Sequence, residues 1–481
     1  MKRVLKWIGA VLLVPVFLFL LLAVILYIPP VQDFMVKRVA DYASRETGMD
    51  VRVDRLRLSF PLDLSLQGVS VADAQGDTLL RVEDLTVDVY LATLFRGSVK
   101  VETLELNRAY VDTKDLISGL GFKGGLERFT LDTDDINLAH QRAMLNRIRL
   151  ETCQLEIALG ADTAQKDTAS SPVNWILEVK RAEIADSRLR LRMPGDSMVI
   201  NAALTDVALA HGFLDLGEQL YRAERFDLKS DSLRYDLPYQ PVTTGLDVNH
   251  LGISNIDIRI DSVEFRGENT ALAAVFRHAT MKEKSGLVLS DLTGHIRLDS
   301  ASLFLPDLEL RTPDSQLRAQ AEMDWHALTP QADGTLAVRL SADLGKQDLL
   351  LFAGGLPQAF VRAYPNRPVR LRLSADGNMN RVMLNRLDVR LEDVFELEAD
   401  GTLTALADAD RRQADVRLAA RTKNLDMVKA LAGPAAMRDV ALPPMQLDGR
   451  LQADGSRYTA RMDLKERSGK VSFNGSYDTR Q

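Results

Sequence analysis

Beyond residue 50 the chain alternates between hydrophobic and polar residues over most of its length. Ile256, Ile258 and Ile260, for example, are separated by single charged residues. Because successive side chains of a β-strand point to opposite faces, this period of two predicts strands with one apolar and one charged face. The apolar positions of the clearest runs are Leu62, Leu64, Leu66, Leu85, Val87, Val89, Leu104, Leu106, Leu189, Leu191, Ile256, Ile258, Ile260, Leu371 and Leu373.

Short polar breaks separate these runs and predict tight antiparallel turns, because Asp, Asn, Ser and Gly favour turn conformations. The breaks lie at Asp77 and at residues 107–108, 185–187, 261–262, 299–300, 313–315 and 400–401. The alternation also changes parity between Val53 and Leu56. That change predicts a bulge or a break near Arg55.

Three segments do not follow the strand pattern. Apolar residues recur every three or four positions over residues 32–47, which predicts a short amphipathic helix that ends at Gly48. Residues 348–364 predict a helix broken by glycine and proline, and residues 424–431 predict a short helix. Small polar residues at 161–171 predict an exposed loop.

The N-terminus carries a long uncharged segment, with Trp7 and Ile28 at its ends. About 20 apolar residues suffice to cross a bilayer, and this run is too long for a signal peptide and ends without a small-residue cleavage site. The basic residues before Trp7 predict that the N-terminus stays cytoplasmic. We therefore expect a cytoplasmic tip and transmembrane anchor at 1–30, the amphipathic helix at 31–48, and β-structure beyond the membrane at 49–481.

The β-structure has to hide a large amount of apolar surface. Similar runs continue from residue 51 without a linker, and at about 12–15 residues per strand and turn they allow on the order of 30 strands. One architecture is an elongated, curled antiparallel sheet, a U-shaped trough with a few short helices, whose concave side the apolar residues line. The other is a series of two or three β-sandwich domains, each with its own core. The pattern alone does not choose between them.

Composition excludes several classes of protein. The net charge of −7 over 481 residues provides no concentrated positive surface for nucleic acid. Cys153 is the single cysteine, so an internal disulfide and a multi-thiolate metal site are excluded. It lies in an alternating run, and we interpret it as an inert, half-buried thiol. We expect no cofactor.

Catalytic motifs are also missing from the sequence. His140, His211, His250, His278, His295 and His326 never stand at metal-ligand spacing. Residues 132–137 are acidic but lack the glycine and the closing acid of a calcium loop, so we interpret them as a solvated turn. Residues 121–125 predict a flexible loop. An enzyme on a β-solenoid is the remote alternative, because no coil repeat of fixed length is visible.

The order of these features resembles the AsmA-like superfamily and, within it, the TamB branch found in diderm bacteria. The matching segments are short, and the specificity comes from their order along essentially the whole chain. They are residues 27–32, 45–48, 51–53, 68–73, 76–80, 85–111, 281–287 and 308–315. Chains of this branch are normally longer and end in a distinct C-terminal β-domain, so the resemblance implies an N-terminal portion or a short relative.

The resemblance implies the trough rather than the sandwiches, anchored in the inner membrane and extending into the periplasm. It also implies a role in outer-membrane biogenesis, with two hypotheses for the mechanism. In the first, the apolar face conducts phospholipid acyl chains between the inner and outer membranes. In the second, the sheet is a scaffold for assembly or secretion of outer-membrane proteins, together with an outer-membrane barrel partner. The first hypothesis requires an unbroken apolar face, and the second requires an unprotected sheet edge.

Overall fold

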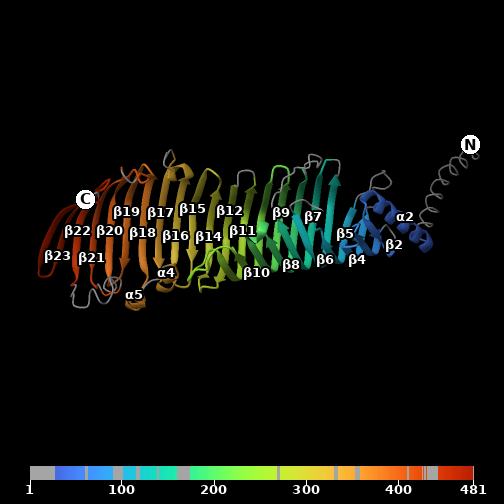
Figure 1. The fold of residues 1–481 in the computed structure, drawn as a ribbon, viewed down its shortest axis with the longest axis horizontal. Helices are drawn as coiled ribbons and strands as arrows, with labels where there is room; N and C mark the ends of the chain where they lie inside the picture. The colour runs from blue at the N-terminus through green and yellow to red at the C-terminus, as the bar shows by residue number, and fades with distance from the viewer. Residues whose placement is uncertain are drawn as a thin grey trace, which may run out of the picture. The chain divides into compact units, whose positions relative to one another are not determined.

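The computed structural model describes residues 28–59, 63–89, 101–114, 120–137, 140–159, 174–267, 271–329, 334–352, 358–408, 411–424, 426, 430 and 443–479. Within them, 24 strands form one open sheet, accompanied by a few short helices (Figure 1). A mainly β fold with one large sheet is therefore confirmed, in place of consecutive sandwiches. The predictions for residues 1–27, Leu62, residues 161–171 and most of residues 424–431 lie outside the described residues.

The chain forms two compact units, which are described separately. The first comprises residues 1–217 and 233–239, and the second comprises residues 218–232 and 240–481. The first holds α2 (Pro29–Thr47), β1 (Asp50–Arg52), β2 (Arg55–Ser59), β3 (Asp63–Ala72), β4 (Thr78–Val89), β5 (Val101–Asp112), β6 (Leu120–Asn137), β7 (Arg142–Leu159), β8 (Ile176–Arg192), η1 (Pro194–Asp196) and β9 (Val199–Asp215).

Strand β10 (Leu220–Asp236) belongs partly to each unit. The other elements of the second unit are β11 (His250–Arg266), β12 (Ala271–Glu283), β13 (Val288–Leu289), β14 (Asp291–Leu298), β15 (Ser302–Arg311), β16 (Gln316–Asp324), η2 (Trp325–Leu328), β17 (Leu336–Leu344), α4 (Lys346–Phe352), α5 (Gln358–Ala363), β18 (Val369–Asn378), β19 (Arg381–Leu391), β20 (Phe395–Thr404), β21 (Gln413–Thr422), β22 (Met445–Asp454), β23 (Arg457–Glu466) and β24 (Gly469–Asp478).

Helix α2 confirms that residues 32–47 are helical, and it packs on the first two strands. Its buried side chains, Gln32, Val36 and Ala40, are spaced four residues apart, so they share one face of the helix. Gly48 ends the helix at φ 70°, and its N–H donates to the carbonyl of Ser44, as expected of a glycine C-cap. The predicted break near Arg55 is also confirmed, since β1 and β2 pair with separate halves of β3.

One strand pair contradicts the predicted antiparallel order. β7 and β8 run parallel, with Arg142 opposite Ile176 and Ala158 opposite Arg192. The remaining described pairs of the first unit, from β1 to β9, are antiparallel. The prediction was wrong here because alternation reads the same in both chain directions. A period of two identifies the faces of a strand but carries no information about its direction.

Long strands crossed by a crease characterise the first unit. β6 and β7 have 18 residues each, and β8 and β9 have 17 each. Pairing is interrupted at the same level in neighbouring strands, where Arg108, Thr152 and Asp186 adopt φ values of 50°, 52° and 47°. The crease, as we call this line of positions at which the strand register is interrupted, runs through Gly68, Glu83, Arg108, Glu127, Thr152, Asp186 and Thr205.

The crease keeps the apolar residues on one face. Each strand contributes one extra residue there, which shifts its parity by one as a bulge does. Leu106 and Ala109 are three residues apart on β5, yet they pair with the apolar Leu85 and Val82 on the two sides of the crease. Val82, Ala109 and Cys153 are buried beside it, at 2%, 9% and 5% exposure, so Cys153 is more deeply buried than expected.

Several predicted turns lie inside strands, and those predictions were wrong. Residues 107–108, 185–187, 261–262 and 400–401 belong to β5, β8, β11 and β20, and the predicted loop at 121–125 and turn at 132–137 both belong to β6. Asp, Ser and Gly tolerate positive φ in bulges as well as in turns, so composition does not separate the two. The turns at Asp77, 299–300 and 313–315 are confirmed.

The second unit contains an antiparallel ladder from β14 to β24, visible as successive strands in Figure 1. Register shifts interrupt four of its pairs, β14–β15, β15–β16, β18–β19 and β19–β20. Between β17 and β18 the predicted broken helix is confirmed as α4 and α5. Phe360 and Tyr364 pack on Leu391 and Val394 in a small core beside this ladder. Asp348 of α4 is buried and accepts a hydrogen bond from the Ser315 hydroxyl at 2.5 Å, which ties the helix to the turn before β16.

Candidate functional site: the apolar face

An uninterrupted apolar surface covers one face of the ladder from β15 to β24. Residues directly opposite in neighbouring strands share a face, and four cross-strand rows of ten positions each contain only Leu, Val, Ala, Met, Phe, Tyr and Gly. We call these forty positions the apolar lattice.

The rows can be followed from partner to partner across the ten strands. The first contains Leu308, Ala319, Leu340, Leu373, Leu387, Ala399, Leu418, Gly449, Met462 and Phe473, and the second Leu310, Leu317, Ala342, Leu371, Val389, Leu397, Ala420, Leu447, Leu464 and Val471. The third contains Leu305, Ala321, Val338, Ala375, Leu384, Gly401, Val416, Leu451, Ala460 and Gly475, and the fourth Leu303, Met323, Leu336, Gly377, Val382, Leu403, Ala414, Ala453, Tyr458 and Tyr477.

The apolar lattice is not the inside of a core. Among its forty positions only Ala342 and Ala399 are buried, at 5% and 8% exposure. The others are half-buried or exposed, although a Leu, Val or Phe side chain gains roughly 1.5–3 kcal/mol when it is fully buried. Open apolar surface on this scale marks a binding surface more often than an ordinary protein exterior.

Part of the apolar lattice is hollowed. A hollow of about 460 Å³ lies over β21 to β24, where Ala460 and Gly475 leave room between larger side chains. Val416 and Leu451 line it, and Tyr458 lies beside them. Its volume is within the range of small-molecule pockets, roughly 300–1,000 Å³.

Most of the described residues that were predicted to line the groove pair with other apolar residues across neighbouring strands. Leu371 and Leu373 are lattice positions. In the first unit, Leu64 and Leu66 pair with Val87 and Leu85, which pair in turn with Leu104 and Leu106, and Val89 pairs with Val101. Across the crease, Leu189 and Leu191 pair with Leu155 and Ile157. Whether this surface binds anything stays a prediction.

On β11 the predicted separation of faces is also present. Ile256 is buried at 5% exposure, and Ile258 and Ile260 pair with Ala279 and Phe276. The charged residues between them make ion pairs instead: Arg259 contacts Asp227 at 2.8 Å, and Arg277 contacts Asp261 at 2.7 Å.

The opposite face of the ladder carries paired charges. Asp388 is 4% exposed, and this burial raises its pKa. Hydrogen bonds from Arg386 and Arg390 lower the pKa by more, so the net pKa of Asp388 is below its ordinary value. Glu309 accepts hydrogen bonds from Arg311, Gln316 and Arg318. These bonds, that from Arg311 most of all, lower the pKa of Glu309 to about 2. Both carboxylates are therefore ionised at neutral pH.

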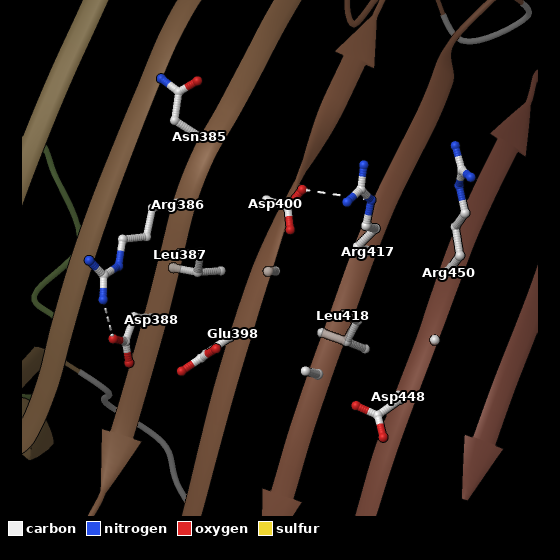
Figure 2. Close-up of a pocket in the computed structure, with 13 residues that line it drawn as sticks. Asn385, Arg386, Leu387, Asp388, Glu398, Asp400, Arg417, Leu418, Asp448 and Arg450 are labelled. Atoms are coloured by element: carbon white, nitrogen blue, oxygen red, sulfur yellow. Dashed lines mark hydrogen bonds and ion pairs between the residues drawn. The ribbon is translucent and has the colours of Figure 1, made fainter.

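A second hollow, of about 590 Å³, lies on this charged face over β19 to β22 (Figure 2). Two ion pairs join its lining side chains, Arg386 with Asp388 at 2.9 Å and Arg417 with Asp400 at 4.0 Å (Figure 2). Arg450 pairs instead with Asp415 of β21, which does not line the hollow. Among the described residues, no group of three or more His, Cys, Asp or Glu side chains is placed to hold a metal ion.

Of the forty lattice positions, sequence reasoning named only Leu371 and Leu373, both in β18, as lining residues. The signal was available in the alternation of Phe395, Leu397 and Ala399 and again of Val416 and Leu418. Alanine and glycine weaken that signal because these small residues occur on either face of a strand. The pairing of strands was needed to show that small residues such as Gly449 continue a row of leucines.

Comparison with known proteins does not extend this assignment. No family model, no curated protein and no solved structure matches the chain. None of the helices in the described part of the chain is both long and apolar enough to cross a membrane.

Proposed function

We propose that the chain is a single-pass inner-membrane protein whose periplasmic sheet conducts phospholipid acyl chains along its apolar face, between the inner and outer membranes. The observation that carries this proposal is the apolar lattice: forty adjoining positions without a charge, only two of them buried. The resemblance to TamB-like proteins and the uncharged segment that ends at Ile28 support the location.

The physical basis is the uniformity of the lining. Each methylene group that moves from water to an apolar surface contributes about 0.8 kcal/mol, so an acyl chain strongly prefers the lattice to water. Neighbouring strands present nearly the same surface, so an acyl chain that moves by one strand exchanges equivalent contacts. A headgroup can remain in water throughout, because the lattice is open.

Two consecutive alanines of β21 allow a matched test. Ala420 belongs to the apolar lattice between Leu397 and Leu447, whereas Ala419 lies on the charged face between Glu398 and Asp448. Ala420→Lys places a cation in the lattice, which costs several kcal/mol if the charge is buried and less where the side chain reaches water. Ala419→Lys places the same cation between two carboxylates. We expect only Ala420→Lys to impair outer-membrane integrity, with both proteins folded by circular dichroism.

Photo-crosslinking identifies the cargo. A photoreactive residue at Leu418 should capture phospholipid, and one at Arg417, on the charged face, should not. Equal function of the two lysine variants, or no lipid at Leu418, would refute the conduit. Capture of an outer-membrane protein at Leu418 would replace it with the assembly scaffold.

A further inference from the structure

Helix α2 presents its aromatic side chains on the face that points away from the sheet. Phe34 is 60% exposed and Tyr42 is 61% exposed, whereas the face toward β1 and β2 buries Gln32, Val36 and Ala40. An amphipathic helix ordinarily packs its largest apolar side chains against the protein. In α2 the two aromatic residues are on the other side.

Contacts with the first strands hold this orientation. The Gln32 side-chain amide donates to the carbonyl of Leu58 at 3.5 Å. At the other end of the helix, the Ser44 hydroxyl accepts from the N–H of Val51 at 3.0 Å and donates to its carbonyl at 3.4 Å. The outward face is therefore fixed relative to these strands and does not rotate freely.

Positive charge gathers around the aromatic residues. Successive residues of an α-helix are about 100° apart, so Arg38, Arg45 and Lys37 lie within roughly 60° of Phe34 around the axis. Asp41 is the one acid in that sector, and the other acids of α2, Asp33 and Glu46, lie about 100–120° away. The Arg38 guanidinium also lies 5.3 Å from the centre of the Phe34 ring, within range of a cation–π contact.

We propose that the outward face of α2 lies flat on an anionic bilayer surface. Aromatic rings favour the headgroup region, and arginine and lysine bind lipid phosphates while their stems remain in apolar surroundings. In this arrangement Phe34 and Tyr42 are at headgroup depth, and Lys37, Arg38 and Arg45 contact the phosphates. The proposal does not depend on the apolar lattice carrying lipid.

Spin labels on the full-length chain test the depth of this face. Cysteines replace Phe34 or, as a matched control, the neighbouring Asp33, and the protein is placed in nanodiscs of phosphatidylcholine with or without phosphatidylglycerol. We expect a label at position 34 to be more accessible to oxygen than to a water-soluble nickel chelate, and the reverse at position 33. The difference at position 34 should grow with phosphatidylglycerol.

Charge reversal separates anionic lipid from other partners. Each basic residue near an anionic surface is worth roughly a fivefold change in binding, so Arg38→Glu with Arg45→Glu should abolish the effect of phosphatidylglycerol. A label at position 34 that stays in water in both lipids would refute the proposal. Spin–spin broadening in detergent without lipid would also refute it, because it would assign this face to a second copy of the chain.

Discussion

At the crease, single residues hold backbone conformations that their side chains disfavour. Thr152 has φ 52° although it is β-branched, and such a conformation costs about 1–2 kcal/mol for an ordinary L-residue. Asn tolerates the left-handed region better than any β-branched residue. The native threonine at this position is therefore under local strain.

Thr152→Asn should stabilise the protein by about 0.5–1 kcal/mol, because part of this strain is relieved. Urea denaturation of the full-length chain measures the change. Thr130→Asn is the control, since Thr130 pairs regularly with Arg149 in β6 and Asn is a poor strand former. The interpretation is wrong if both substitutions destabilise the protein equally.

The faces of individual residues were largely predictable from sequence. Leu371, Leu373 and Ile258 lie where alternation places them, because the parity of a strand depends on local sequence alone. The crease was not predictable, because nothing in the sequence around Arg108 or Asp186 distinguishes an unpaired residue within a strand from a turn. That difference arises from the neighbouring strands, which extend the pairing beyond the break.

Among the secondary elements, α5 depends on one small core. Leu391 of β19 is completely buried and packs with Phe360 and Tyr364. Few other described side chains of the second unit are buried to this extent. The attachment of α5 to the ladder therefore depends on a handful of contacts.

Leu391→Ala should destabilise this region by about 2–5 kcal/mol, because it leaves a cavity where the surroundings cannot fully collapse. Hydrogen exchange should accelerate at residues 358–363 and in the adjoining part of β19. Leu397→Ala, in the half-buried lattice, should cost roughly 1 kcal/mol because little area is lost from contact. Similar effects from both substitutions would contradict a localised core.

The elements themselves were predicted unevenly. Residues 348–364 contain glycine and proline in the middle of an apolar run, which correctly indicated two short helices, α4 and α5. The parallel direction of β8 was not predictable, because Leu189 and Leu191 alternate in the same way whichever direction the strand runs. The direction of a strand depends on the connection that leads to it, and the alternation within the strand carries no information about direction.

Within each unit as a whole, the substantial contacts between described strands are all between neighbours in the sheet. Such one-dimensional packing makes stability a sum of local terms, as in repeat proteins. A single cooperative transition is then not expected for the entire chain. Two tryptophans, Trp175 in the first unit and Trp325 in the second, report on different regions.

The Trp175→Phe and Trp325→Phe variants should therefore show different urea midpoints of unfolding when tryptophan fluorescence is followed. Each variant retains the tryptophan of the other unit, while Trp7 is common to both. Circular dichroism of the unsubstituted chain should show a broad transition that spans both midpoints. Coincident midpoints in both variants would mean that the two units unfold as one.

The antiparallel ladder from β15 to β24 also bears on how such a chain can change in length during evolution. Each strand there reverses the direction of the one before it and keeps the same two faces. Duplication of one hairpin restores both direction and faces, so the strands on either side still match. Duplication of a single strand reverses everything that follows it. Lengthening by tandem duplication is therefore least disruptive in steps of two strands, and each step extends the apolar lattice without a new fold.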